Sequence, residues 1–144
     1  MKHVFFLLFA LFLFVGNADA QSKSKGSKNK PYRIVFQMVS KDTADHNAMV
    51  RQLFNIRKLS PSTNLEVVCH GPGMSFIHKE KSLVLEKLKM LAAEKVDFVA
   101  CEFTMQQKNI KKEQLLDESR TVPGGILEIV DKQSKGWSYI KAGY

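Results

Sequence analysis

The strongest constraint on the fold of this chain is a regular alternation of apolar strands and amphipathic helices. Three runs of strand length, 32–39, 65–69 and 96–101, consist largely of apolar and β-branched residues. Strands of this kind are buried on both faces, as in a parallel sheet covered by helices. The two segments between them repeat apolar residues at helical spacing and predict helices that end near Leu59 and Glu94. This order of elements predicts an α/β domain with right-handed crossovers.

The pattern is weaker beyond residue 101, where we expect two further strands and two further helices. A loop that includes residues 104–108 is followed by a short predicted helix around 111–118 and an extended segment at 120–122. Apolar residues at helical spacing then predict a helix over 126–133, which Gly136 ends. Residues 137–141 predict the last strand.

The first twenty residues have the pattern of a signal peptide. Lys2 precedes an unbroken apolar stretch at 4–15, and a small-x-small motif at 18–20 follows it. Twelve apolar residues rise only about 18 Å as a helix, which is less than the roughly 30 Å hydrocarbon core of a bilayer. We therefore expect cleavage after Ala20 and a periplasmic or secreted product with no stable membrane insertion. The alternative is an uncleaved N-terminal anchor.

Much of the formal charge of +8 comes from the segment after the predicted cleavage site. Five of the 22 Lys and Arg residues and one of the 14 Asp and Glu residues precede residue 32, which leaves 17 against 13 for residues 32–144. Residues 21–31 are rich in lysine, serine and glycine and predict a flexible basic linker, or alternatively a binding arm for anionic lipid or polysaccharide. Nucleic acid is not expected as a partner, because the domain lacks interleaved basic and aromatic residues.

Both cysteines end predicted strands. Cys69 ends the second strand and Cys101 the third, so both are expected at the carboxyl edge of the sheet, where open parallel sheets bind ligands. We expect the two thiols to open onto a shared mouth there. Three interpretations stay open: packing as small buried side chains, a reactive thiol at Cys101, and a disulfide. The disulfide requires neighbouring strands, with Cα atoms about 5 Å rather than about 10 Å apart.

His70 and four glycines flank the predicted site. His70 follows Cys69 directly and is a candidate acid, base or thiolate partner, or a histidine satisfied by the backbone of a turn. Gly71 and Gly73 in one loop, and Gly124 and Gly125 at a helix N-terminus, can offer amides to an anion. Glycines in tight turns can also serve backbone shape alone.

Common enzyme signatures are missing from the sequence. It contains no phosphate-binding P-loop, no dinucleotide fingerprint, no nucleophile elbow, no CxxC and no metal-spaced cluster of His and Cys. We therefore expect neither a cofactor nor a metal. His46 and His78 have no comparable context and are expected at the surface or at helix ends.

Four stretches, which together span most of the predicted domain, carry a resemblance to a known family. They are Arg-Ile-Val-Phe-Gln at 33–37, Val-Val-Cys-His-Gly-Pro-Gly at 67–73, Val-Ala-Cys-Glu-Phe-Thr-Met at 99–105, and Val-Pro-Gly-Gly-Ile-Leu-Glu-Ile at 122–129 leading to Gly-Trp-Ser-Tyr-Ile at 136–140. In these stretches the chain resembles the DsrE/DsrF-like proteins of sulfur trafficking, and among them the small single-domain members. The resemblance implies a three-layer α/β/α sandwich with a mainly parallel five-stranded sheet, and a homotrimer or homohexamer. It also implies that the second and third strands are adjacent, which makes a bridge between Cys69 and Cys101 geometrically possible.

In better-understood members of this family a cysteine accepts sulfur as a persulfide and passes it to a partner. Cys101 resembles that carrier, and Glu102 and Thr104 follow it in the same turn, where Phe103 stands in place of the usual Asn. The resemblance thus implies sulfur trafficking or a thiol-redox role through Cys101, with a sulfur donor or acceptor protein as partner. Under this hypothesis Glu102 helps to set the pKa of the Cys101 thiol. The alternatives are a non-catalytic, homo-oligomeric module that binds a small ligand or an anion, with both cysteines structural, and a scaffold held by a disulfide.

Overall fold

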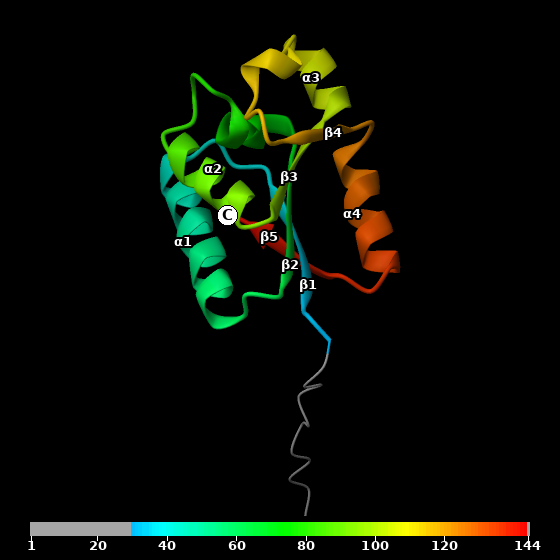
Figure 1. Cartoon of the computed structure of the whole chain (residues 1–144). Helices are drawn as coiled ribbons and strands as arrows, with labels where there is room; N and C mark the ends of the chain where they lie inside the picture. Colours follow the sequence, from blue (N-terminus) through cyan, green and yellow to red (C-terminus); the bar gives the residue numbers. More distant parts are fainter. Residues whose placement is uncertain (1–29, 144) are drawn as a thin grey trace, which may run out of the picture.

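A five-stranded sheet runs through the middle of the computed structural model, which describes residues 30–143 (Figure 1). All four strand pairings are parallel, and the strand order is β4-β3-β2-β1-β5. The strands are β1 (Arg33–Met38), β2 (Asn64–Cys69), β3 (Val96–Cys101), β4 (Arg120–Val122) and β5 (Ser138–Ala142). This confirms the predicted sheet. The predicted signal peptide (1–20) and nearly all of the predicted linker (21–31) lie outside the described residues.

Helices cover both faces of the sheet and give three layers, as expected. Figure 1 shows helices α1 (Thr43–Leu59) and α2 (Leu85–Ala93) on one face and α4 (Gly125–Ser134) on the other. Helix α3 (Glu102–Lys108) lies beyond the end of β3, and two short 3₁₀ helices, η1 (Gly71–Ile77) and η2 (Lys112–Gln114), complete the fold. No helix within residues 30–143 is both long and apolar enough to cross a bilayer.

The two faces of the sheet bury cores of unequal size. The larger core lies against α1, α2 and η1 and includes Phe36, Phe76 and Phe98. The core beneath α4 consists of five aliphatic side chains, with Trp137 packed against them: Val35, Val68, Val99, Val122 and Ile129. Because successive side chains of a strand point to opposite faces, each central strand contributes to both cores. This explains why the central strands carry apolar residues on both faces.

Two predictions for residues 102–118 are wrong. The expected loop after Cys101 is the helix α3, which begins as soon as β3 ends and stops at Asn109 in the left-handed region (φ 51°). The expected helix at 111–118 is reduced to the single turn η2. Leu115 and Leu116 are fully buried, and the Leu116 amide donates to the carbonyl of Ile77. The chain after η2 is therefore extended along the core and does not continue as a helix.

His46 and His78 lie at helix ends, in the first turn of α1 and at the C-cap of η1, as one of the two expectations had it, but they are buried and not at the surface. Each side chain is only 2% exposed. The His46 Nε2 lies 2.9 Å from the carbonyl oxygen of Ser40, and its ring meets Phe76 edge-on at 5.0 Å. The His78 Nδ1 accepts from the amide of Glu80 at 3.2 Å. Backbone partners remove the cost of burying both imidazoles, which sequence context did not reveal.

A charge network beneath α4 fixes this helix to the sheet. Glu66, which is fully buried in β2, accepts hydrogen bonds through Oε2 from Lys132 of α4 and from Arg120 Nη2 of β4, the latter at 3.1 Å. Arg120 also bonds Asp97 Oδ2 at 2.8 Å and Glu128 Oε1 at 2.7 Å. Burial raises the pKa of Glu66 to about 7 against the attraction of Lys132 and Arg120.

This network predicts a pH-dependent contribution of Glu66 to stability. Its folded pKa of about 7 lies above the ordinary 4.5, so its contribution is fully present below about pH 4.5 and is lost as the pH rises through 7. Glu66→Gln cannot ionise. We therefore expect the free energy of unfolding of the variant, measured by urea denaturation, to rise relative to the wild type by on the order of 2 kcal/mol between about pH 5 and about pH 8.

Asp131→Asn is the matched control, because Asp131 forms an exposed pair with Lys135 on the same helix. Its difference from the wild type should stay flat over this range. A flat difference for Glu66→Gln as well would contradict the role given to the buried carboxylate.

Candidate functional site

Cys101 lies where β3 ends and α3 begins, with its side chain on the α4 face of the sheet. It pairs with Val122 of β4, is 6% exposed, and occupies the N-cap position of α3. The first turn of α4 closes over it. A methyl group placed on Gly125 would lie 3.2 Å from the Cβ of Cys101 and 3.1 Å from Val68 Cγ1. Only glycine allows the α4 backbone to come this close to the thiol.

Four hydrogen-bond donors converge on the Cys101 thiol. They are the backbone amides of Gly125 and Thr104, the hydroxyl of Thr104 and, to the smallest extent, the amide of Phe103, which also donates to the carbonyl of Pro123 at 3.3 Å. Burial alone would raise the pKa of Cys101, but these donors outweigh it and bring the pKa below its ordinary value. The site therefore favours the thiolate, which is the nucleophilic form of cysteine.

Thr104 is held in place from the opposite side. Its hydroxyl oxygen accepts from the Gly71 amide at 3.0 Å, so the hydroxyl proton is free to point at Cys101. Thr104 is buried, and it joins the turn after β2 to the start of α3. The sequence-based choice of Thr104 as a site residue thus acquires a specific role as a donor to the thiol.

Cys69 does not share this site, contrary to the predicted common mouth. It pairs with Ala100, one position before Cys101, and adjacent positions in a strand face opposite sides of the sheet. Cys69 is therefore fully buried in the core against α1 and α2, where burial raises the pKa of its thiol strongly. Both cysteines are free. The interpretation of Cys69 as a packed side chain fits, and the disulfide does not.

His70 lies beside Cys101 on the α4 face. Its Cβ would lie 3.4 Å from a methyl group on Gly125, the same position that Cys101 approaches. The His70 Nε2 lies 2.8 Å from Gln37 Nε2, and Gln37 Oε1 accepts from the hydroxyl of Tyr139. Burial lowers the pKa of His70, which favours the neutral ring. Sequence analysis missed Gln37 and Tyr139, although a glutamine in an otherwise apolar strand was a usable signal.

The predicted anion-binding glycine amides have other partners. The Gly71 amide donates to Thr104, and the Gly73 amide donates to the carbonyl of His70 at 3.0 Å. The role of Gly73 is steric, since a methyl group there would lie 2.1 Å from the carbonyl oxygen of Met38. Of the four glycines, Gly125 has the direct chemical role, because its amide donates to the Cys101 thiol.

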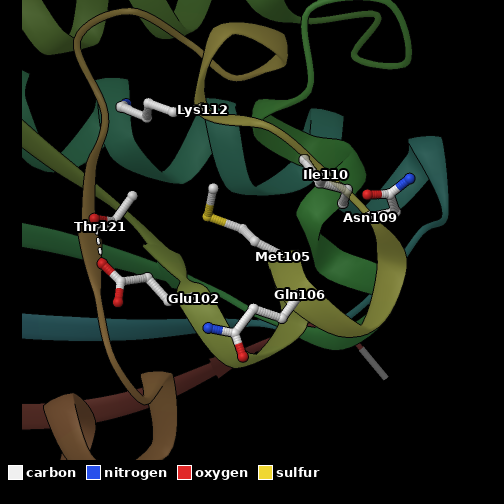
Figure 2. A pocket seen from close by; sticks show the side chains of 7 residues that line it. All are labelled: Glu102, Met105, Gln106, Asn109, Ile110, Lys112 and Thr121. Carbon is white, nitrogen blue, oxygen red and sulfur yellow. Dashed lines mark hydrogen bonds between the residues drawn. The ribbon is translucent and has the colours of Figure 1, made fainter.

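Glu102 belongs to a neighbouring pocket and not to the hydrogen bonds around the thiol. Its Oε1 accepts from the Thr121 hydroxyl at 2.6 Å. Backbone amides and the Thr104 hydroxyl, and not the Glu102 carboxylate as expected, lower the pKa of the Cys101 thiol. Figure 2 shows Glu102 beside a pocket of about 430 Å³ along α3. The other lining residues are Met105, Gln106, Asn109, Ile110, Lys112 and Thr121. Within residues 30–143, no three His, Cys, Asp or Glu side chains are grouped to hold a metal ion.

The close approach of α4 predicts a contrast between two adjacent glycines. Gly125→Ala forces the first turn of α4 away from Cys101 and weakens the amide contact with the thiolate. We expect the thiol pKa to rise by about one unit, which slows alkylation by iodoacetamide about tenfold near neutral pH. The pH dependence of the alkylation rate measures this shift.

Gly124→Ala is the control, because its methyl group would meet Phe103 and Leu127 at ordinary contact distances of 3.7 Å. It should leave the alkylation profile unchanged. Equal profiles for both alanine variants would show that the Gly125 amide does not act on the thiol.

Comparisons with known proteins agree with this architecture. The model of the DsrE/DsrF-like family matches residues 33–142. Among solved structures, MTH1491, a protein of unknown function from Methanobacterium thermoautotrophicum, is 26% identical with a TM-score of 0.73, over 76% of this chain and 98% of that chain. The ychN protein from E. coli shares the fold at 10% identity and a TM-score of 0.65, over 78% of this chain and 99% of its own. No protein with a curated description matches. The chain belongs to the DsrE/DsrF-like family, which is associated with sulfur relay.

Proposed function

We propose that this protein carries sulfur as a persulfide on Cys101. The observation that supports this most is the set of three amides and one hydroxyl that donate to a single, slightly exposed thiol. Such a site stabilises a sulfur anion without a metal, an oxyanion hole or a general base. The association of the family with sulfur relay supports the same assignment.

The proposed transfer needs only a thiolate and a donor with a sulfane sulfur. The Cys101 thiolate attacks the outer sulfur of a hydropersulfide, R–S–SH, and forms a new Sγ–S bond. The S–S bond of the donor breaks, and R–S⁻ leaves with the bonding electron pair. The proton stays on the transferred sulfur until solvent removes it, so no external oxidant or reductant is required. Attack by an acceptor thiolate on the same outer sulfur returns Cys101 to its thiolate.

The position of Cys101 at the carboxyl edge of the sheet suits exchange with a partner protein. Phe103 and Leu127, which are 61% and 69% exposed, lie in contact distance of Gly124 beside the site. Exposed apolar side chains of this size are typical of protein contact surfaces. We therefore propose a donor or acceptor protein as the partner, and from the predicted signal peptide we place the encounter in the periplasm or outside the cell.

Mass spectrometry after incubation with a persulfide donor tests the proposed function. We expect the wild type to gain the mass of one sulfur atom on the peptide that contains Cys101, and Cys101→Ser to gain none. Cys69→Ser is the matched control and should load like the wild type, because Cys69 is fully buried on the other face. Loading of Cys101→Ser, or no loading of the wild type, would contradict the proposal. A thiol-redox role would instead give a mixed disulfide at Cys101.

One observation favours the second candidate, a non-catalytic module that binds an anion. A pocket of about 310 Å³ beside Gly71 is lined by Lys41, Lys81 and Lys108 and by no carboxylate. These lysines form none of the salt bridges recorded within residues 30–143. If this function is the principal one, Cys101→Ser retains full anion affinity while a Lys81→Ala, Lys108→Ala variant loses it.

We also propose assembly as a homotrimer or homohexamer. Besides Leu127, which is assigned above to the partner protein, α4 exposes Ile126 and Val130 one helical turn apart, and we assign these two to the contact between subunits. We expect light scattering to give a mass that is three or six times that of the chain, and Ile126→Glu with Val130→Glu to reduce it. Leu83→Glu is the control, since Leu83 is also an exposed apolar residue but lies before α2. A monomeric wild type would overturn the assembly.

A further inference from the structure

A chain of three polar side chains crosses the sheet and ends beside Cys101. Tyr139 of β5 donates its hydroxyl proton to Oε1 of Gln37 in β1, since a carboxamide oxygen can only accept. The other end of the Gln37 amide, Nε2, lies 2.8 Å from Nε2 of His70. The amide nitrogen can only donate, so His70 Nε2 must be the acceptor. In the structure the Gln37 amide thus turns its oxygen to Tyr139 and its nitrogen to His70.

This direction of donation fixes the tautomer of His70. Because Nε2 of the neutral ring accepts, the ring proton must be on Nδ1. Within residues 30–143, Nδ1 has no hydrogen-bond partner, and the ring is only half-buried. A histidine held only for structure has no need of a relay that leaves one N–H unused. The chain Tyr139–Gln37–His70 thus presents a fixed donor on the same face as Cys101.

The four donors around Cys101 act on Sγ and leave a persulfide only partly stabilised. When Cys101 accepts a sulfur atom, the negative charge moves to the outer sulfur, about 2.0 Å farther along the new S–S bond. The amides of Gly125 and Thr104 act on Sγ itself, and the outer sulfur lies one bond beyond it. His70 is a neighbour of Cys101 at the first turn of α4, because the Cβ atoms of both residues approach the same point at Gly125.

We propose that His70, oriented by Gln37 and Tyr139, donates its Nδ1 proton in a hydrogen bond to the outer, anionic sulfur of a persulfide on Cys101. This assignment rests on the proposed function. It makes His70 a specificity-determining residue for the loaded state, and Gln37 and Tyr139 positioning residues that act through it. The unloaded thiolate depends on the amides, and the loaded persulfide depends on the imidazole. No proton is transferred and no bond to His70 forms.

The experiment compares two substitutions of His70 in the full chain. His70→Asn keeps a donor near the position of Nδ1, whereas His70→Leu removes it while keeping an apolar body of similar width. Each protein is loaded with glutathione hydropersulfide, and alkylation is followed against pH for the bare thiol and for the persulfide. We expect His70→Leu to raise the pKa of the persulfide by about one unit, which slows its alkylation about tenfold below that pKa. The persulfide of His70→Asn should be alkylated at nearly the wild-type rate. Neither variant should shift the bare thiol of Cys101.

Nitrogen NMR of the unloaded protein reads the tautomer without any sulfur chemistry. The wild type should show a protonated Nδ1 and an unprotonated Nε2 at His70, and Tyr139→Phe should populate the other tautomer as the Gln37 amide becomes free to turn over. A protonated Nε2 in the wild type overturns the inference, as do equal effects of His70→Asn and His70→Leu. If the wild type accepts no sulfur on Cys101, both the proposed function and this inference are overturned. If it accepts sulfur but His70 carries its proton on Nε2, only the inference is overturned.

Discussion

The contact between the first turn of α4 and the end of β3 is the interaction on which the rest of the site depends. The Gly125 amide reaches the Cys101 thiol only because residue 125 has no side chain and Val68 and His70 leave no room for one. Helix α4 is held in this position by ion pairs from Lys132 and Glu128 to charged residues of the sheet. Burial would normally raise the pKa of the Cys101 thiol, and the amide dipole of Gly125 helps to offset this effect. The chemistry at residue 101 is therefore a property of how one helix packs.

The two faces of the sheet have different tasks. The face under α1 and α2 holds most of the large apolar side chains and buries Cys69, which contributes packing and no chemistry. The α4 face has a thin apolar layer, and its polar side chains are organised around it: the Glu66 network near the start of the strands, and Cys101, His70 and Gln37 near their carboxyl ends. Most of the apolar packing and the Cys101 site thus lie on opposite faces of the same strands, and only the packing of α4 links stability to the site.

Sequence reasoning predicted the five strands, α1, α2, α4 and the position of Cys101 at the end of a strand, because each follows from local periodicity or from the polar residues after it. It failed where the outcome depends on contacts between distant segments. Whether Cys69 and Cys101 share a face depends on a one-residue offset in the register of β2 and β3, which no local pattern records. Likewise, the sequence predicted a loop where α3 lies, and it did not show that His46 and His78 are buried, because their backbone partners are known only in the fold. The Tyr139–Gln37 bond joins residues 102 positions apart.

The place of β5 in the sheet has a consequence for how the chain acquires its structure during synthesis. β5 pairs in parallel with β1, so the first strand to leave the ribosome has its outer edge completed by the last strand. Pairings between such distant segments form late and slow the overall rate of folding. The hydrogen bonds around Cys101 use residues up to 125, whereas Gln37 gains its phenol partner only once residue 139 has emerged. A nascent chain that lacks residue 139 would therefore leave the outer edge of β1 unpaired and Gln37 without its phenol partner.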